Sequence, residues 1–284
     1  MQNHRADPTN FFQPAKHKKV TKYYYNTLNQ LVSQRMPDHS DVSNVNLVYG
    51  TTLFLYDEVK RPIASQTPQQ QAEYSFSYSL YDVFGRILES GEAKLGGTLN
   101  GTAITSFVGL QSAVQSYDDL KTYVLSVGRK DVTKTYYDER ADFSADPTSP
   151  FATKQQTFLR NRISWTETIK YEGAWPNQNS ETSDFATQYY YSYDVHGNVD
   201  RFYQKQQLSQ IARISKYMEY TYDLISGNVI QLVYQPGQND QLAHRYFYDA
   251  QNRLTEVETS TDNHIWTSDA KYIYYPHGPL ARIE

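Results

Sequence analysis

Residues 74–88 read YSFSYSLYDVFGRIL, and this stretch decides the fold of the chain. Large residues alternate with serine as far as Leu80, a period of two that predicts a half-buried β-strand. Tyr81-Asp82 comes next, and Asp is favoured at the first position of a type I turn. Gly85 adopts a positive φ without steric cost, and Ile87 begins a second apolar run. The stretch therefore predicts a β-hairpin.

The same pattern recurs along the chain. Close copies begin at Tyr25, Tyr81, Tyr193 and Tyr248, and looser copies begin at Tyr56, Tyr137, Tyr222 and Tyr274. The copy at Tyr137 keeps only its first two residues, and the copy at Tyr274 lacks the Asp. Successive copies lie 25 to 31 residues apart, except for two intervals of 56, which is twice 28. We therefore expect about nine steps of ~28 residues, in which each hairpin needs its neighbours to complete a sheet.

The turn of each copy has a position suited to left-handed backbone. Residues 29, 85, 197, 252 and 278 are all Asn or Gly, the types that tolerate positive φ most cheaply. Lys60 occupies this position in one copy and predicts a distorted turn there. The Asp carboxylates can accept N–H bonds within the turn, so we interpret them as turn-stabilising residues rather than catalytic acids.

One region departs from the hairpin pattern. From Phe107 to Val127 apolar residues recur every three or four positions, which predicts one or two short helices in place of one hairpin. Ser116 and Asp119 fit a capping box, and Gly128 fits a helix end. The expected organisation is an N-terminal tail (1–20), hairpin repeats (21–98), a helical insertion (99–135) and further repeats (136–284) with polar loops at 141–152 and 174–187.

Composition excludes several classes of protein. The chain has 284 residues, no cysteine, 27 tyrosines and a net charge of −4. Without cysteine there are no disulfides and no thiolate zinc sites, and the near-neutral charge gives no reason to expect nucleic acid. Residues 1–22 lack the apolar run of a secretory signal, and no stretch of the sequence is long and apolar enough to span a bilayer. We interpret the basic run at 16–22 as a solvated tail rather than a phosphate-binding arm.

No residues form a recognisable catalytic, cofactor-binding or metal-binding motif. The seven histidines include no zinc-binding pair, and His196 and His277 are expected to be exposed at turns. The run 38–41 contains triad residue types without triad geometry, and Gly96-Gly97 lacks the residues of a phosphate loop. Glu89 and Glu92 are the nearest approach to a carboxylate pair for sugar hydrolysis, but the sequence predicts no cleft between them. We therefore expect no catalytic, cofactor or metal residues and no enzyme.

Three tryptophans keep an alternative function open. Trp165 stands in an alternating run and is expected to pack in a core, as is typical of strands. Trp175 lies beside Pro176 in a polar loop and is the best candidate for an exposed ring. An exposed ring of this kind could stack on sugars, so a cell-surface adhesion or carbohydrate-binding module is the alternative function.

The repeats resemble the YD repeats of bacterial Rhs proteins, which are related to the toxin-complex C component and to the teneurin shell. The resemblance is closest over 21–37, 78–92 and 189–284, in phrases such as YDVFGRILESGE and YYPHGPLARIE. It implies a spiral β-sheet that winds into a hollow shell around a toxic or other cargo polypeptide. Family shells are several times longer and end in an autoproteolytic segment with Asp-Pro motifs. The two Asp-Pro pairs here, at 7–8 and 146–147, lie in another context, so no family site residue is carried over.

The resemblance predicts a non-enzymatic segment of such a shell. It implies a secreted or cell-surface location, reached through secretion machinery by a route that no N-terminal signal in this chain encodes. The runs 271–275 and 280–283 carry no proline or charge placed to prevent edge pairing until Pro276 and Pro279. We therefore expect the C-terminal sheet edge to be covered by further shell repeats, by a partner chain or by self-association.

Overall fold

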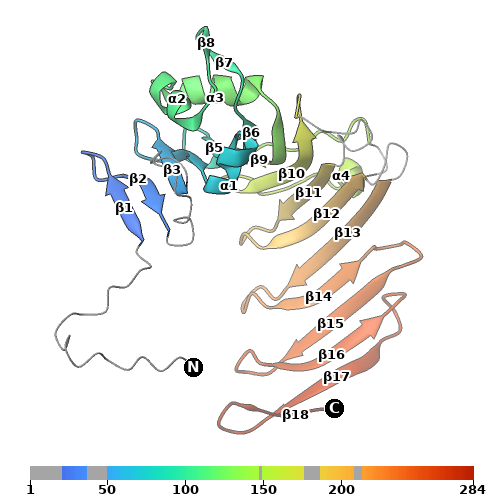
Figure 1. Cartoon of the computed structure of the whole chain (residues 1–284). Coiled ribbons are helices and arrows are strands. Elements are labelled where there is room, and N and C mark those ends of the chain that lie inside the picture. Colours follow the sequence, from blue (N-terminus) through green and yellow to red (C-terminus); the bar gives the residue numbers. More distant parts are fainter. Residues whose placement is uncertain (1–20, 37–49, 147–148, 176–185, 208–212) are drawn as a thin grey trace, which may run out of the picture. The chain divides into compact units, whose positions relative to one another are not determined.

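The computed structural model describes residues 21–36, 50–146, 149–175, 186–207 and 213–284. Sixteen strands follow one another in a single antiparallel order, β1-β2-β3-β4-β5-β6-β9-β10 and then β11 to β18 in sequence. Strands β11 to β18 lie side by side in chain order (Figure 1). The mainly all-β fold of serial hairpins is therefore confirmed.

The strands differ in length from four to ten residues. They are β1 (Lys22–Tyr25), β2 (Leu31–Arg35), β3 (Thr51–Tyr56), β4 (Pro62–Gln66), β5 (Ser75–Tyr81), β6 (Ile87–Lys94), β9 (Arg129–Tyr137), β10 (Ile163–Glu172), β11 (Ala186–Tyr193), β12 (Val199–Gln207), β13 (Arg213–Tyr222), β14 (Val229–Tyr234), β15 (Leu242–Tyr248), β16 (Leu254–Ser260), β17 (Thr267–Tyr274) and β18 (Leu280–Ile283). Two short strands, β7 (Thr98–Leu99) and β8 (Thr102–Ala103), form a separate pair.

In the described residues the sheet contains eight hairpins, which are separated by seven steps, so the expectation of about nine steps is wrong. Both intervals of 56 residues arise from insertions, and no hairpin is missing from either. Residues 95–128 are inserted between β6 and β9, which are nevertheless neighbours in the sheet. The helical segment therefore lies between two hairpins and does not replace one. The second interval is lengthened inside the turn between β9 and β10 and again between β10 and β11.

The described chain forms two compact units, and the first comprises the described residues 21–36, 50–80, 91–129 and 173–175. It holds α1 (Pro68–Glu73), α2 (Phe107–Ala113) and α3 (Tyr117–Ser126). The two helices predicted from the apolar spacing, and the Ser116–Asp119 capping box of α3, are confirmed. The core forms where Phe76 of β5 meets Phe107 of α2 and Tyr123 of α3, with ring centroids 5.8 and 6.2 Å apart. These three side chains are at most 1% exposed.

Helix α1 was missed because it is short. Thr67 caps it and Pro68 stands at its first turn, a combination that fits a helix start but is followed by only one and a half turns. Tyr74 ends it in a left-handed conformation, which a bulky residue adopts only under constraint from its surroundings. The alternating stretch quoted above therefore begins as a helix cap and becomes a strand at Ser75.

The second unit comprises residues 81–90, 130–172 and 176–284. Most of its strand residues are half-buried, as expected where tyrosines stand on a sheet whose faces remain partly in water. Its buried hydrophobic cluster consists of Phe151, Tyr190, Tyr203 and Tyr217. Phe151 belongs to the short helix α4 (Pro150–Thr153), which the sequence did not predict. Across the described part of the chain, no helix has the length and apolar character needed to cross a membrane.

Candidate binding site on the repeat sheet

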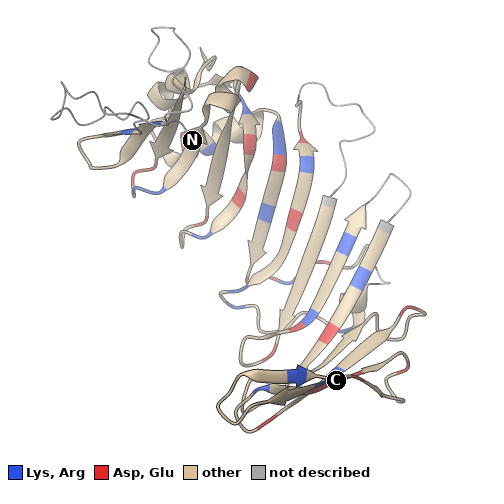
Figure 2. Cartoon of the chain, turned by 60° about the horizontal axis from the view of Figure 1, so that its bottom comes forward, with Lys and Arg blue, Asp and Glu red and all other residues tan. Residues whose placement is uncertain are grey.

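The Asp residues of the motif stabilise the hairpin turns, as predicted. The Asp82 carboxylate accepts backbone N–H bonds from Phe84 (2.8 Å) and Arg86 (2.9 Å), and its second oxygen accepts from Arg86 Nε (2.6 Å). The same arrangement recurs at Asp57 with Arg61 and at Asp249 with Arg253. Figure 2 shows acidic and basic residues next to one another at hairpin turns. Burial alone would raise the pKa of Asp82, but the bonds from Arg86 and Phe84 outweigh it and lower that pKa.

The position that we expected to be left-handed has positive φ in the five turns where it is Asn or Gly, and the sixth turn, at Lys60, differs from its prediction. Asn29, Gly85, Gly197, Asn252 and Gly278 all have positive φ. Lys60 does not distort its turn: it adopts φ 70° itself. Asp57 still accepts the N–H bonds of Val59 (3.0 Å) and Arg61 (2.8 Å). Lys60 thus adopts the left-handed conformation in a turn that keeps the Asp bonds of the other copies.

In six of the described hairpins, the Tyr of the motif connects the hairpin to the one before it. Its hydroxyl donates a hydrogen bond to the backbone carbonyl of the residue that begins the return strand of the preceding hairpin. The pairs are Tyr56 with Leu31 (3.0 Å), Tyr137 with Ile87 (3.1 Å), Tyr193 with Ile163 (2.9 Å), Tyr222 with Val199 (2.8 Å), Tyr248 with Val229 (2.9 Å) and Tyr274 with Leu254 (2.8 Å). We call this series the tyrosine ladder. It gives the motif Tyr a role that the sequence analysis missed.

The motif at Tyr137-Asp138 is complete in space although its two halves are separated in sequence. The Asp138 N–H donates to the Arg162 carbonyl (3.2 Å), as Asp82 N–H does to Arg86 (2.9 Å) in an uninterrupted turn. Asn161 has φ 59° and donates its N–H to the Asp138 carboxylate. Ile163 then begins the return strand and accepts the ladder bond from Tyr193. Residues 139–160, which we call the inserted segment, thus interrupt the turn without destroying it.

The inserted segment packs on one face of the sheet, which we call the covered face. Phe143 lies 4.9 Å from Tyr190 between ring centroids, and Phe151 lies 6.1 Å from Tyr217 and 6.3 Å from Tyr203. Tyr190, Tyr203 and Tyr217 stand directly opposite one another on β11, β12 and β13. Their alignment creates a row of rings on this face, and burial raises the pKa of Tyr190 to about 12. The inserted segment is therefore a polypeptide held on the sheet by aromatic contacts.

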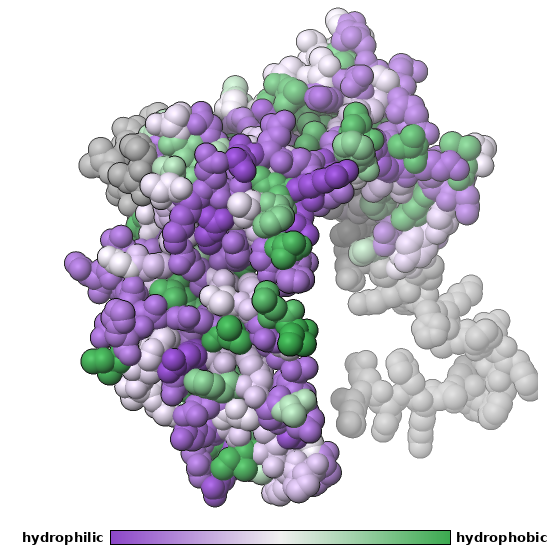
Figure 3. Space-filling model, turned by 180° about the vertical axis from the view of Figure 1, so that it is seen from behind, coloured by the Kyte–Doolittle hydropathy of each residue, from purple (hydrophilic) through white to green (hydrophobic). Residues whose placement is uncertain are grey.

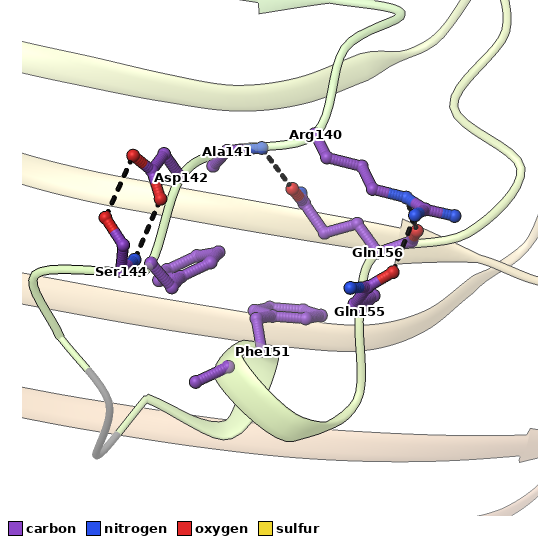
Figure 4. A pocket seen from close by; sticks show the side chains of 9 residues that line it. Arg140, Ala141, Asp142, Ser144, Phe151, Gln155 and Gln156 are labelled. Atoms are coloured by element: carbon purple, nitrogen blue, oxygen red, sulfur yellow. Dashed lines mark hydrogen bonds between the residues drawn. The ribbon is translucent and has the colours of Figure 1, made fainter.

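Polar contacts fix the second half of the inserted segment. Gln156 is 2% exposed, and its amide donates to the carbonyls of Ser164 (2.7 Å) and Tyr191 (2.7 Å). The same amide accepts the N–H of Ala141 (2.8 Å), which joins the two arms of the segment (Figure 4). Arg201 of β12 donates to the carbonyls of residues 154 and 155. Lys205 pairs with Asp146 at 2.7 Å, which fixes the first half as well.

One pocket lies within the inserted segment, and a second lies beside it. The first, of about 380 Å³, lies within the segment between Phe143, Phe151 and Arg140 (Figure 4). Arg140 donates there to the Gln156 carbonyl (2.9 Å) and to the Gln155 side chain (2.6 Å). The second, of about 530 Å³, lies between α4, the strands β12 and β13, and the turn that follows β14. Volumes of this order are typical of ligand pockets, so the second pocket is the candidate binding site.

The second pocket has a fixed floor. Tyr217 donates its hydroxyl to Glu219 (2.8 Å), and Glu219 pairs with Lys154 of the inserted segment. Burial and the bond to Glu219 raise the pKa of Tyr217. Gln235 follows β14 and accepts the backbone N–H of Tyr217 through its side chain (2.7 Å). These contacts connect the floor of the pocket to the inserted segment and to the turn after β14.

The structure places the described histidines and glutamates that the sequence singled out at two turns and on one strand. His196 and His277 are exposed at turns, as predicted. Glu89 is buried on β6, whereas Glu92 is half-buried. In the described ranges no three His, Asp or Glu side chains lie close enough to hold a metal ion. The run 38–41, most of the loop at 174–187 and the basic run at 16–22 up to residue 20 fall outside the described residues, and Lys22 begins β1.

The two tryptophans of the sequence argument differ in outcome. Trp165 stacks on Tyr136 with centroids 4.2 Å apart and packs against the buried cluster, so its core role is confirmed. Trp175 is half-buried, and the ammonium of Lys94 lies 4.5 Å from the centre of its ring. The best candidate for an exposed ring is therefore only partly exposed. Figure 3 shows the hydrophobic residues of one side of the molecule as separate patches among polar ones, not as one broad apolar surface.

Comparison with known proteins finds similarity among solved structures. No family model and no curated protein matches the chain. Among solved structures, it is similar to a chain of the Photorhabdus luminescens Tc holotoxin pore, with a TM-score of 0.30 and 13% identity. The alignment covers 94% of this chain and 14% of that one, so this chain spans about a seventh of its length.

Proposed function

We propose that this chain is a non-enzymatic structural segment of an Rhs-type YD-repeat shell that encloses or presents a secreted cargo polypeptide. The observation that carries the proposal is the tyrosine ladder, because its six hydrogen bonds each join a hairpin to the preceding one. Hairpins joined in this way extend a sheet by addition of identical units, which is the construction principle of repeat proteins. A wall built by repetition suits enclosure of a polypeptide.

The way the motif residues are used supports a structural role. The Asp carboxylates accept turn N–H bonds, the Arg side chains pair with them, and the Tyr hydroxyls bond to neighbouring hairpins. These groups are engaged in holding the sheet together. A catalytic role would require convergent groups with room for a reacting atom between them.

The proposed partners follow from the strand order. Strand β18 ends the order and has a single neighbour, β17. Its four residues are exposed, and an edge of this kind offers unpaired N–H and C=O groups to another strand. We assign this edge to further shell repeats, a partner chain or a second copy. Secretion machinery and a secreted or cell-surface location belong to the same proposal.

Electron cryo-microscopy of the protein as its native host produces it would test the proposal. We expect a hollow particle in which the hairpin series continues beyond β18 along one uninterrupted sheet. A compact particle without a continuous sheet would overturn the proposal. The alternative of a carbohydrate-binding module is not favoured, because the tryptophan that motivated it, Trp175, has Lys94 over its ring.

A further inference from the structure

The strand order of the sheet has two outer edges. Strand β1 stands at one end of the order and β18 at the other, and within the described residues each has a single neighbour. The two strands have the same length, and all four residues of each are exposed. An exposed edge of this kind offers unpaired N–H and C=O groups to another strand. The joins between hairpins inside the sheet show what kind of strand covers such an edge.

Strand β1 carries the donor of a ladder bond. Tyr25 stands where the ladder tyrosines stand, directly before the turn residue Asn26, whose side-chain oxygen accepts the N–H bonds of Leu28 (3.0 Å) and Gln30 (2.9 Å). The six ladder tyrosines are half-buried, whereas Tyr25 is 57% exposed. No described strand lies beyond β1 to supply the carbonyl that the Tyr25 hydroxyl would bond. Among the described residues, the ladder thus begins with an open donor.

Strand β18 carries the matching acceptor. Leu280 begins the return strand of the last described hairpin, as Leu254 does in the hairpin before it. The Leu254 carbonyl accepts the hydroxyl of Tyr274 from the next hairpin (2.8 Å). The Leu280 carbonyl has the same place in its own hairpin, but no described strand lies beyond β18 to bring a tyrosine to it. The ladder thus ends with an open acceptor in the described part of the chain.

The backbone groups at the two edges also match. Glu284 and Lys271 exchange both backbone N–H bonds (2.9 Å each). Such bonded pairs alternate along antiparallel strands, so Ala281 directs its N–H and its carbonyl away from β17. Tyr23 stands three residues before the backbone bond that closes its turn, as Tyr272 does on β17, and likewise directs its backbone groups away from β2. The register that β16 keeps with β17 brings Ala281 opposite Tyr23.

One pair of side chains makes this join weaker than those inside the sheet. At the join of β16 and β17, Glu256 stands opposite Lys271, and the two side chains pair at 3.4 Å. The same register places Arg282 of β18 opposite Lys22 of β1. Like charges directly opposite each other destabilise a strand pair. Arg282 also pairs with Glu284 (2.6 Å), which offsets part of that repulsion.

We propose that β1 of one copy of this chain pairs antiparallel with β18 of a second copy, and that Tyr25 of the first donates its hydroxyl to the Leu280 carbonyl of the second. The pairing continues both the alternation of strand direction and the tyrosine ladder from one copy to the next. Because the two edges differ, the contact is heterologous and recurs from copy to copy. The inference rests on the proposed function in one respect, because it names the partner of the β18 edge assigned there.

The test uses the full chain and two variants that each close one edge. Ala281→Pro removes an outward N–H from β18, and Tyr23→Pro removes one from β1, whereas the bonds to β17 and β2 are retained. The matched controls, Ala281→Val and Tyr23→Val, keep the N–H. Thermal melting checks that every variant folds, and sedimentation velocity from micromolar to millimolar concentrations measures association.

We expect the unaltered chain and both valine variants to associate as the concentration rises, and each proline variant alone to stay monomeric. A mixture of the two proline variants should form a dimer and nothing larger, because Ala281→Pro keeps β1 open and Tyr23→Pro keeps β18 open. A monomeric mixture, or an unaltered chain that stays monomeric, would overturn the inference. Association of either proline variant alone would show an edge pairing with itself and would overturn it as well.

Two milder substitutions test the ladder bond and the register. Tyr25→Phe keeps the ring and should weaken association about two- to tenfold, the effect of one hydrogen bond. Tyr24→Phe is its control and should leave association unchanged. Arg282→Glu places an acidic residue opposite Lys22, as in the join of β16 and β17, and should tighten association about two- to fivefold. Equal effects of the two tyrosine variants, or weaker association of Arg282→Glu, would refute this arrangement of the two edges.

Failure of this inference and failure of the proposed function give different results. A hollow particle in the microscope, together with a chain that stays monomeric in the centrifuge, would retain the shell and reject the pairing of β1 with β18. Association through these two edges into particles that enclose no space would retain the pairing and reject the shell.

Discussion

The turns at Asp82 and at Asp138 have the same hydrogen-bonding plan but different chain connections. In the first, Asp82 and Arg86 are four residues apart, and both the backbone and the side chain of Arg86 bond to the Asp82 carboxylate. In the second, residues 139–160 separate Asp138 from Arg162, and the ion partner of Asp138 is Arg86 of the neighbouring hairpin (2.8 Å). The comparison shows that the hydrogen bonds of the turn can form when its Asp and its return strand are far apart in the sequence.

Arg86 explains how the interrupted turn is compensated. Its guanidinium pairs with both Asp82 and Asp138 and lies 4.2 Å from the centre of the Tyr137 ring. Arg162, the residue equivalent to Arg86 in the interrupted turn, donates instead to the Phe158 carbonyl within the inserted segment (2.7 Å). Arg86 of the intact turn thus forms the ion pair with Asp138 of the interrupted turn. Arg162 of the interrupted turn bonds to the inserted segment instead.

The largest expected effect concerns the insertion that distinguishes the two turns. Phe151→Ala removes a 2% exposed ring from contact with Tyr203 and Tyr217, and truncation of a buried Phe costs about 3–5 kcal/mol. The control is Phe84→Ala at the tip of the intact turn, where the ring is 78% exposed. It should change the free energy of unfolding by less than about 0.5 kcal/mol. Urea unfolding of both variants measures the difference, and equal losses would refute the packing of the inserted segment on the sheet.

The second effect tests the left-handed position of the intact turn. Gly85 has φ 82°, and Gly85→Val places a β-branched residue in that conformation at a cost of about 1–2 kcal/mol. Val83→Thr in the same turn should cost much less, because Val83 is 94% exposed. Thermal melting compares the two variants. A similar loss of melting temperature in both would show that the positive φ at Gly85 is not required by the turn.

The sequence predicts the hairpins because each turn is coded locally. Asp82, Gly85 and Ile87 lie within six residues, and the turn chemistry of those types has few alternatives. The interrupted turn was not predicted because its second half, Asn161-Arg162-Ile163, stands far from Asp138 in the chain. Asn161-Arg162-Ile163 resembles Asn252-Arg253-Leu254 but has no Tyr-Asp directly before it. That resemblance is the signal that could have revealed the second half of the interrupted turn.

The candidate pocket could not be predicted from local patterns at all. Its walls come from the inserted segment and from the turn after β14, which lie about 80 residues apart in the sequence. Each hydroxyl of the tyrosine ladder likewise bonds to a backbone carbonyl, a group that every residue carries, so no residue type identifies the acceptor. Fixed spacing between copies is the one signal for that bond, and the two insertions obscure it.

The third effect is a pH dependence of stability that arises from the Asp carboxylates of the two turns. The pKa values of Asp82 and Asp138 both lie below the ordinary value of 3.8. For Asp138 the main cause is the hydrogen bond from Arg86, followed by the N–H of Asn161. A carboxyl with a lowered folded pKa stabilises the fold above its unfolded pKa, and that stabilisation is lost as the pH falls through the folded value. We therefore expect melting temperatures to fall as the pH drops below about 4.

Variants assign that acid-induced loss to particular groups. Arg86→Gln removes the partner of both carboxylates and should flatten the pH dependence below 4 more than Asp138→Asn alone. Arg253→Gln, which removes the partner of Asp249 in another intact turn, is the control and affects a single carboxylate. If Arg86→Gln changes the acid profile no more than Arg253→Gln does, then Arg86 does not serve both turns.

The smallest effect tests whether the tyrosine ladder passes through the interrupted turn unchanged. Tyr193 donates to the carbonyl of Ile163, beside the interrupted turn, and Tyr248 donates to Val229, beside an intact one, both at 2.9 Å. Replacement of either by Phe keeps the ring and leaves a carbonyl without its donor. Loss of one such bond costs about 0.5–1.5 kcal/mol, and the two variants should lose the same amount.

The control is Tyr275→Phe, whose ring is 50% exposed and stacks on His277, and it should be near neutral. Chemical denaturation measures all three. A loss at Tyr248 without a loss at Tyr193 would mean that the insertion breaks the ladder, and that the hairpins on its two sides are not stabilised as one series.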